Sequence, residues 1–257
     1  MKITFLGTGT SQGVPLVACD CVVCKSLDPR NKRYRSSIYV ETGTHKIVVD
    51  TTVDFRWQCL DFDVKRVDAV LITHCHADHV MGLDDIRRFN ALQKDAIPLY
   101  GSPDSIQRLK SIFPYAIRKA PEYPGYPCLH SNEVTDAFQL GETKITPVSL
   151  PHGKIDVYGY IFQENGAPRC AYLTDCNAVT PECLEQIRGV PVLILDALRE
   201  ASHPTHLSIG EALEVVKDAN PQRSYFIHMC HEVDHEQTNA KLPAGVELAY
   251  DGLRVEC

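Results

Sequence analysis

Three histidines and one aspartate follow a single apolar segment of the chain. Residues Ala69–Thr73 have the pattern of a β-strand, and they are followed directly by His74-Cys75-His76-Ala77-Asp78-His79. Each neutral imidazole brings a donor and an acceptor that need partners, so a polar turn or a core of buried histidines explains this density poorly. In extended backbone His74 and His76 point to one side and Cys75 to the other. The spacing therefore predicts a metal site beside a cysteine that only packs.

Further ligand types follow at the ends of other strands. Asp78 and His79 are expected to open the next helix, where a turn aims them at a second metal ion about 3.5–4 Å from the first. His152, Asp175 and His228 each end an apolar segment. Taken singly, each is explained equally well as a capping or core residue. Three segments that end in the same way favour one shared site.

These side chains need a scaffold, and the chain offers alternating strands and helices. The β-rich segments are Lys2–Leu6, Ser37–Val40, Lys46–Val49, Ala69–Thr73, Ile97–Tyr100, Lys144–Ser149, Val157–Phe162, Cys170–Thr174, Val190–Leu195, Ser224–His228 and Val246–Val255, the last with a turn at Asp251-Gly252. Helical periodicity covers Leu83–Gln93, Asp104–Ile112, Thr180–Ile187 and Ile209–Asp218. This order favours sheets with helices packed outside them. The segment Pro114–Asn132, which holds Pro114, Pro121, Pro124 and Pro127, is expected to be a loop or lid.

The ligand motifs resemble those of the metallo-β-lactamase superfamily over essentially the whole chain, which is expected to form one domain of residues 1–257. The resemblance implies an α/β fold, an αββα sandwich of two mixed sheets flanked by helices. It also implies one metal on His74, His76 and His152. The second metal would be held by Asp78, His79 and His228. Asp175 would bridge the two, and Asp50, at the end of an earlier strand, would orient a ligand.

The residue at position 175 narrows the chemistry that the resemblance implies. The lactamases usually have a cysteine where this chain has Asp175, whereas hydrolytic and phosphodiesterase branches have aspartate. A lactamase is therefore not expected. A bridging carboxylate holds two hard or borderline cations without the soft thiolate that favours zinc alone, so two divalent ions, manganese or zinc, fit this site.

A cysteine cluster near the start of the chain predicts a second kind of metal site. Cys19, Cys21 and Cys24 place three thiols in six residues, which suits a tetrahedral structural zinc with one further ligand. His231, three residues after His228, is the candidate for that ligand, and Cys230, His203 and His235 are the alternatives. The competing interpretation is a set of buried small hydrophobic residues or a redox pair.

A histidine outside the ligand set is the candidate general acid. Ser208 and Glu211 form a capping box, so a helix begins there and His206 lies just before it. A protonated imidazole at that place could protonate a leaving oxygen, although an exposed loop histidine is the plainer interpretation of the residues alone. The phosphodiesterase branches have a non-ligand histidine here, which favours the functional interpretation. Lys154, Arg87 and Arg88 are weaker candidates for binding phosphate.

The combination of an aspartate-and-histidine site with the cysteine cluster resembles one branch of the superfamily, the phosphoribosyl cyclic phosphodiesterases of the carbon–phosphorus lyase pathway. A similar thiol cluster occurs in the pyrroloquinoline quinone biosynthesis protein of the superfamily, so the cluster alone does not identify the branch. The resemblance implies a phosphodiesterase in which a metal-bridging hydroxide, oriented by Asp78, attacks phosphorus and His206 protonates the leaving oxygen. The expected partner is a small phosphodiester such as phosphoribosyl 1,2-cyclic phosphate.

Composition excludes several other classes. The 257 residues carry 26 Lys and Arg against 33 Asp and Glu, a net charge of −7, which argues against binding of nucleic acid through its backbone. No segment has the length of a membrane span or of a signal-peptide core, so we expect a cytoplasmic protein without membrane contact. Its 11 cysteines are odd in number and favour metal binding over disulfides in that compartment. Nothing marks an oligomeric interface, and a homodimer is left open.

Three alternative functions remain. A transfer RNA 3′-end endonuclease would share the ligands, but its long RNA-gripping arm has no room between His152 and Asp175, which are 23 positions apart and are separated by a strand pair. A non-catalytic accessory protein of cofactor biosynthesis would keep the fold and the structural zinc. A thioesterase of the glyoxalase type would not account for the cysteine cluster.

Overall fold

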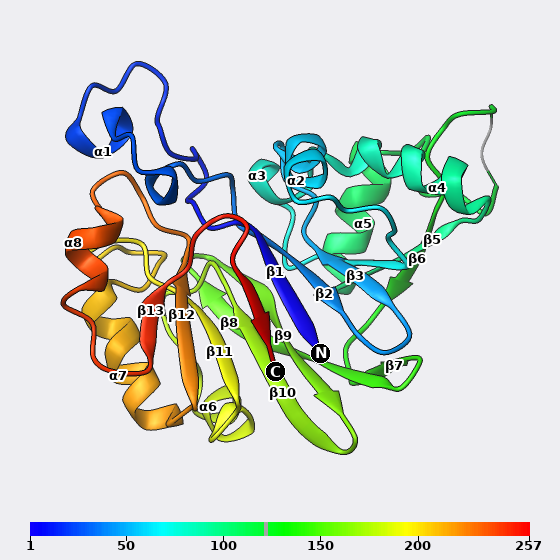
Figure 1. Cartoon of the computed structure of the whole chain (residues 1–257). Coiled ribbons are helices and arrows are strands. Elements are labelled where there is room, and N and C mark those ends of the chain that lie inside the picture. Colours follow the sequence, from blue (N-terminus) through cyan, green and yellow to red (C-terminus); the bar gives the residue numbers. More distant parts are fainter. Residues whose placement is uncertain (121–122) are drawn as a thin grey trace.

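The computed structural model describes residues 1–120 and 123–257, and within them the strands form two seven-stranded mixed sheets (Figure 1). The first sheet has the order β14 (Arg254–Glu256), β1 (Lys2–Gly7), β2 (Ser37–Glu41), β3 (Lys46–Val49), β4 (Ala69–Leu71), β5 (Ile97–Gly101) and β6 (Leu129–Glu133). The second has the order β13 (Val246–Leu248), β12 (Arg223–Ile227), β11 (Val192–Asp196), β10 (Ala167–Leu173), β9 (Ile155–Glu164), β8 (Thr143–His152) and β7 (Phe138–Leu140).

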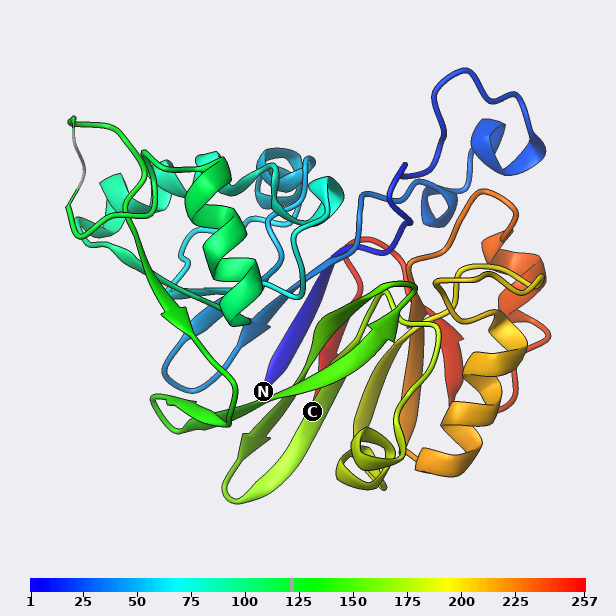
Figure 2. The same cartoon turned by 180° about the vertical axis from the view of Figure 1, so that it is seen from behind.

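Helices cover the outer faces of both sheets (Figure 2). Beside the first sheet lie α2 (Phe55–Asp61), α3 (Ala77–Val80), the 3-10 turn η2 (Leu83–Ile86), α4 (Arg87–Gln93) and α5 (Pro103–Ile112). Beside the second lie α6 (Pro181–Ile187), α7 (Ile209–Ala219) and α8 (His235–Asn239). Two short elements, α1 (Val22–Lys25) and η1 (Pro29–Asn31), belong to the N-terminal loop that projects from the sheets. Among the described residues, no helix has the length and apolarity needed to cross a membrane.

The period-two alternation of the strands produces this layering. Ile47 and Val49 of β3 share one buried cluster with Val192 and Ile194 of β11, so the inner faces of the two sheets pack together. The intervening Val48 packs instead with the helices outside the first sheet. The αββα sandwich expected from the resemblance is therefore confirmed.

Four parallel strands in each sheet place the functional residues along one edge. The pairs β3–β4, β4–β5 and β5–β6 are parallel, as are β10–β11, β11–β12 and β12–β13. The carboxyl ends of parallel strands lie at the same edge of a sheet, which is where functional groups collect. Asp50, Asp175 and His228 follow β3, β10 and β12 closely along the chain.

Three sequence predictions of secondary structure are wrong in part. The segment Val246–Val255 is not one hairpin, because β13 joins the second sheet and β14 the first. The segment Pro114–Asn132 is not a loop to its end, since β6 begins at Leu129 and pairs with β5. Pro121 of that segment lies outside the described residues. The predicted helix Leu83–Gln93 begins as a 3-10 turn. Helix α2 was not predicted, because its exposed Trp57 and Leu60 blur the apolar pattern of a helix.

Candidate metal centre

Three of the strand-end residues have a backbone conformation that is uncommon for residues other than glycine. The φ angles are 63° at Asp50, 54° at Asp175 and 62° at His228. The left-handed region costs free energy for residues with a Cβ, and such positions concentrate at functional sites. The chain thus turns sharply at the end of each strand and holds each side chain at the sheet edge, where all three are almost fully buried.

One ligand set consists of His74, His76 and His152, the residues that the resemblance assigns to the first metal. The Nε2 atom of His74 lies 2.9 Å from the Nδ1 atom of His76. The third ring comes from the end of β8, where His152 Nδ1 donates to the carbonyl oxygen of Thr205 at 2.8 Å. That hydrogen bond leaves Nε2 of His152 as the available ligand atom. Cys75 points away and its thiol donates to the carbonyl of Ser105, as predicted from the alternation of an extended chain.

The second ligand set consists of Asp78, His79, Asp175 and His228. Asp175 Oδ2 lies 3.3 Å from His79 Nε2 and 3.2 Å from His228 Nε2. The same oxygen lies 4.0 Å from His74 Nε2, which belongs to the first set. The Asp175 carboxylate therefore lies between the two sets, where a bridging ligand must be.

Asp50 supports the second set without belonging to it. Its Oδ2 atom lies 2.7 Å from His79 Nδ1, and it also accepts hydrogen bonds from the backbone and hydroxyl groups of Thr73. A carboxylate that accepts from one ring nitrogen fixes the tautomer and presents the other nitrogen to a metal. This is the orienting position that the resemblance implies for Asp50.

Divalent metal ions fit these residues. Among buried side-chain atoms, His79 Nε2 and both ring nitrogens of His228 have no hydrogen-bond partner in the described part of the protein. Although burial opposes ionisation, His228 and His79 hold the pKa of Asp175 well below its ordinary value. Against the same penalty of burial, Asp175 raises the pKa of His228 to about 9. Several imidazoles around an ionised carboxylate form a donor set that suits borderline cations. Where no cation is bound, the same groups hold protons tightly.

A second carboxylate–histidine pair adjoins the ligands. His206 Nδ1 lies 2.8 Å from Asp196 Oδ2, at the end of β11. The His206 ring stacks on His228 with a centroid distance of 4.5 Å and lies 4.9 Å from the ring of His152. His206 was predicted from the sequence, whereas Asp196 was missed. Asp196 directly follows the apolar residues Val192–Leu195, and this place at the end of a strand could have identified it as a candidate.

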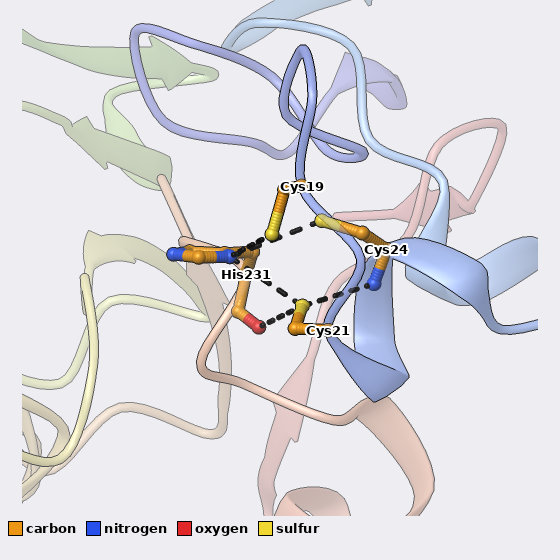
Figure 3. A group of neighbouring side chains, drawn as sticks. All are labelled: Cys19, Cys21, Cys24 and His231. Carbon is orange, nitrogen blue, oxygen red and sulfur yellow. Dashed lines mark hydrogen bonds between the residues drawn. The ribbon is translucent and has the colours of Figure 1, made fainter.

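The cysteine cluster forms a separate site in the N-terminal loop (Figure 3). The Nδ1 atom of His231 lies 3.3 Å from the sulfur of Cys19, 3.5 Å from that of Cys21 and 3.8 Å from that of Cys24. In a tetrahedral zinc site with ordinary Zn–S and Zn–N bonds, sulfur and nitrogen are roughly 3.5 Å apart, so these spacings fit zinc. The thiols converge on His231 in Figure 3, and the alternatives Cys230, His203 and His235 lie outside the cluster.

The predicted phosphate-binding residues have different outcomes. Arg87 forms an ion pair with Asp84, beside the first sheet. Arg88 lines a groove between α2 and α4. Neither side chain belongs to the surroundings of a ligand set, and neither lines the cavity that reaches His74. Lys154 lines a cavity that reaches His74.

Comparison with known proteins accounts for this arrangement. A family model described as the Beta-lactamase superfamily domain matches residues 45–229, which contain both His/Asp ligand sets. The chain belongs to the β-lactamase superfamily. A solved structure of the superfamily fold, described as a new diphosphatase from the PhnP family, is 38% identical, with a TM-score of 0.91, and the match covers 100% of this chain and 97% of that one.

Two curated relatives carry different names. An octanoyltransferase of Porphyromonas gingivalis is 35% identical over 258 residues, covering 98% of this chain and 51% of that protein. A ribonuclease Z of Pyrobaculum islandicum is 28% identical over 218 residues, covering 84% of this chain and 56% of that protein. The chain thus spans about half the length of these two relatives. Their names therefore describe proteins of which only about half is matched by this chain.

Membership of the superfamily and the geometry of the ligand sets together identify this as a candidate metal centre of a hydrolase fold. The chain is similar to a metal-dependent hydrolase of this fold, and it holds a candidate binuclear His/Asp centre and a separate Cys3His cluster. The sequence predicted all eleven residues of these clusters. Asp50 was expected to orient a ligand, whereas the hydrogen bond of His152 to the carbonyl of Thr205 and the pairing of Asp196 with His206 were not predicted.

Proposed function

We propose that this chain is a metal-dependent phosphodiesterase that acts on a small cyclic phosphate sugar such as phosphoribosyl 1,2-cyclic phosphate. The observation that carries the proposal is the position of His206, held by Asp196 beside two ligand sets that meet at Asp175. Hydrolysis of a phosphodiester needs positive charge near the phosphoryl oxygens, an activated water molecule and a proton for the leaving oxygen. The first two needs fit the ligand sets and the third fits His206.

The metal ions would be held as the resemblance implies. His74, His76 and His152 would bind one ion and Asp78, His79 and His228 the other, with Asp175 between them. Zinc or manganese bound there would stabilise charge on the phosphoryl oxygens and allow water to act as a nucleophile near neutral pH.

The protein's own side chains supply orientation and the proton. Asp50 holds His79, and the carbonyl of Thr205 holds His152, so each ring presents its other nitrogen to the site. Although burial opposes it, His79 lowers the pKa of Asp78, which is therefore ionised and suited to orient the attacking water. His206 bonds Asp196 through Nδ1, which leaves its Nε2 to carry the proton for the leaving oxygen.

A small substrate is favoured over transfer RNA by the chain between His152 and Asp175. Strands β9 and β10 occupy this interval and are joined by the turn Asn165–Gly166, so no RNA-gripping arm is inserted there. The name of the Porphyromonas relative describes a protein of about twice the matched length. Nothing in the His/Asp site favours octanoyl transfer by the half that matches here.

The test is phosphorus NMR of the metal-loaded protein with phosphoribosyl 1,2-cyclic phosphate, beside a generic aryl phosphodiester and a precursor transfer RNA. Ring opening of the cyclic substrate is expected. Cleavage of the RNA at its 3′ end would support the endonuclease instead. No turnover of any ester at full metal occupancy would favour a non-catalytic accessory protein.

A further inference from the structure

A groove of about 340 Å³ lies between helices α2 and α4, on the outer side of the first sheet (Figure 1). None of its described lining residues belongs to a ligand set, so the proposed function leaves it unused. Phe55, Val64 and Phe89 line it and are at most 6% exposed, which gives the groove a buried apolar floor. Small-molecule sites have volumes of roughly 300–1,000 Å³ and mostly apolar linings, so this groove has the size and the floor of such a site.

The two helices also leave apolar side chains exposed beside the groove. Leu60 of α2 is 57% exposed and Leu92 of α4 is 52% exposed, and both line the groove. Trp57 lies three residues before Leu60, on the same side of α2, and is 55% exposed. Single exposed apolar residues are ordinary, whereas a group of them around one groove is typical of a surface that a ligand or partner covers. An apolar ligand that enters the groove would bury part of this surface.

The charges around the groove are mostly positive. Arg56 and Arg88 line it, and within the described part of the chain neither forms an ion pair. The third cation, Lys65, is paired with Asp63, and the single carboxylate among the described lining residues is Asp85. The whole chain carries a net charge of −7, so an excess of cations at this place is a local exception. The charges therefore complement an apolar ligand that carries a negative group.

We propose that this groove binds a free medium-chain carboxylate. Its alkyl chain would lie on Phe55 and Phe89, and its carboxylate would accept hydrogen bonds from Arg56 and Arg88, since planar guanidinium groups match a carboxylate. A methylene group takes up about as much space as a water molecule, roughly 30 Å³, so a chain of roughly ten carbons fills the groove. A membrane surface would contact the exposed rim and leave the buried floor empty, which favours a single chain that enters the groove. The site lies apart from the metal centre, and the inference does not rest on the proposed function.

The experiment uses Trp57 as a local reporter. It is the single tryptophan of the chain, and the guanidinium carbon of Arg56 lies 5.1 Å from the centre of its ring. The metal-loaded full chain is titrated with monomeric hexanoate, octanoate and decanoate, and with decyltrimethylammonium. A saturable change in tryptophan emission is expected for the carboxylates, with an affinity that rises roughly fourfold for each methylene added, and little binding is expected for the cation of the same chain length. Titration calorimetry of the same pairs detects a ligand that binds without changing the emission.

Two variants test the residues of the groove. L60Q/L92Q should weaken decanoate binding roughly 10-fold, because it removes apolar contacts at the rim. R88Q should weaken decanoate binding roughly 10-fold and leave the binding of decanol unchanged, because the arginine acts on the charge. The matched controls are L27Q, in the N-terminal loop, and R188Q, at the end of α6, which lie outside the groove and should not change the affinity.

Three results would overturn the carboxylate site: no saturable binding of decanoate by either method, an unchanged affinity in L60Q/L92Q, or equal affinities for decanoate and decyltrimethylammonium. Vesicles of phosphatidylglycerol form a further arm of the experiment. Binding of these vesicles without binding of monomeric decanoate would overturn the proposal in favour of a membrane-facing surface. Circular dichroism of each variant shows whether a loss of binding comes from misfolding. All of these results leave the turnover of phosphodiesters aside, so the proposed function is tested separately.

Discussion

The Nδ1 atom of His206 lies 2.8 Å from the Oδ2 atom of Asp196. The same Asp196 oxygen accepts a hydrogen bond of 2.9 Å from the backbone of Cys176, the residue that follows Asp175. One carboxylate thus connects the candidate acid to the loop that carries the candidate bridging ligand, Asp175. The pair is buried, with Asp196 at 0% and His206 at 9% exposure, so its geometry is well protected from water.

The first prediction concerns proton donation by this pair. H206A is expected to lower kcat on a phosphodiester with an alkoxide leaving group by roughly 100-fold, since general acids contribute factors of this order. With a 4-nitrophenolate leaving group, which departs without a proton, the loss should be much smaller. D196N should show the same pattern at roughly 10-fold, because Asp196 only orients the imidazole. Steady-state kinetics on both substrates measure this, with H203A as the control for a neighbouring ring. Equal losses on both leaving groups would contradict the acid role.

The second prediction concerns Asp175 and the binuclear centre. D175A should lower the metal content of the His/Asp site from two ions to one or none, because Asp175 Oδ2 is close to histidines of both ligand sets. D50N should retain metal but with an affinity weaker by roughly 10- to 100-fold, as expected for a residue that orients a ligand. Metal analysis after dialysis against graded chelator separates the two variants. Two tightly bound ions in D175A would contradict the bridging position.

The third prediction concerns the cysteine cluster. C24S should remove one zinc per chain and lower the melting temperature, because a structural zinc contributes directly to folding. Catalysis should also weaken, since His231 and the ligand His228 are three residues apart on one loop. C230S is the matched control, because Cys230 is buried nearby but lies outside the cluster. Zinc content and melting temperature are the measurements, and loss of zinc in C230S with retention in C24S would refute the assignment.

The fourth prediction is a pH dependence of stability. Burial, with Arg30 and Arg33 nearby, lowers the pKa of His235 from 6.5 to about 4. Between those values the unfolded chain binds a proton that the folded protein does not, so the contribution to stability is full above pH 6.5 and is lost as the pH falls toward 4. The free energy of unfolding of the wild type should therefore fall between pH 7.5 and 5 by about 2 kcal/mol more than that of H235Q.

Urea unfolding of both proteins at the two pH values, with zinc present throughout, tests this difference. Contributions from the other titrating groups cancel between the two proteins. Parallel losses of stability in the wild type and in H235Q would mean that His235 titrates near its ordinary value in the folded state.

The residues of the candidate site could be predicted from the sequence because their signals are local. A ligand that directly follows an apolar strand, as Asp175 and His228 do, is recognised from a few neighbouring residues. The helix at Ile209 was equally readable from its capping box of Ser208 and Glu211, which the structure contains. The two sheets follow from the alternation of the strands and from the resemblance to the superfamily.

Only the tertiary structure decided which distant groups meet. Asp196 and His206 are separated by a loop whose course no local pattern specifies, and Arg108 and Lys154 face one cavity from elements on opposite halves of the fold. The two short strands at the end of the chain enter different sheets although only five residues separate Leu248 from Arg254. Periodicity reports which side of an element is buried, whereas strand order and left-handed turns such as that at Asp175 arise from packing across the whole chain. For that reason the sequence by itself determined the candidate ligands and the layers, and the folded chain determined the partner of His206 and the cavity beside His74.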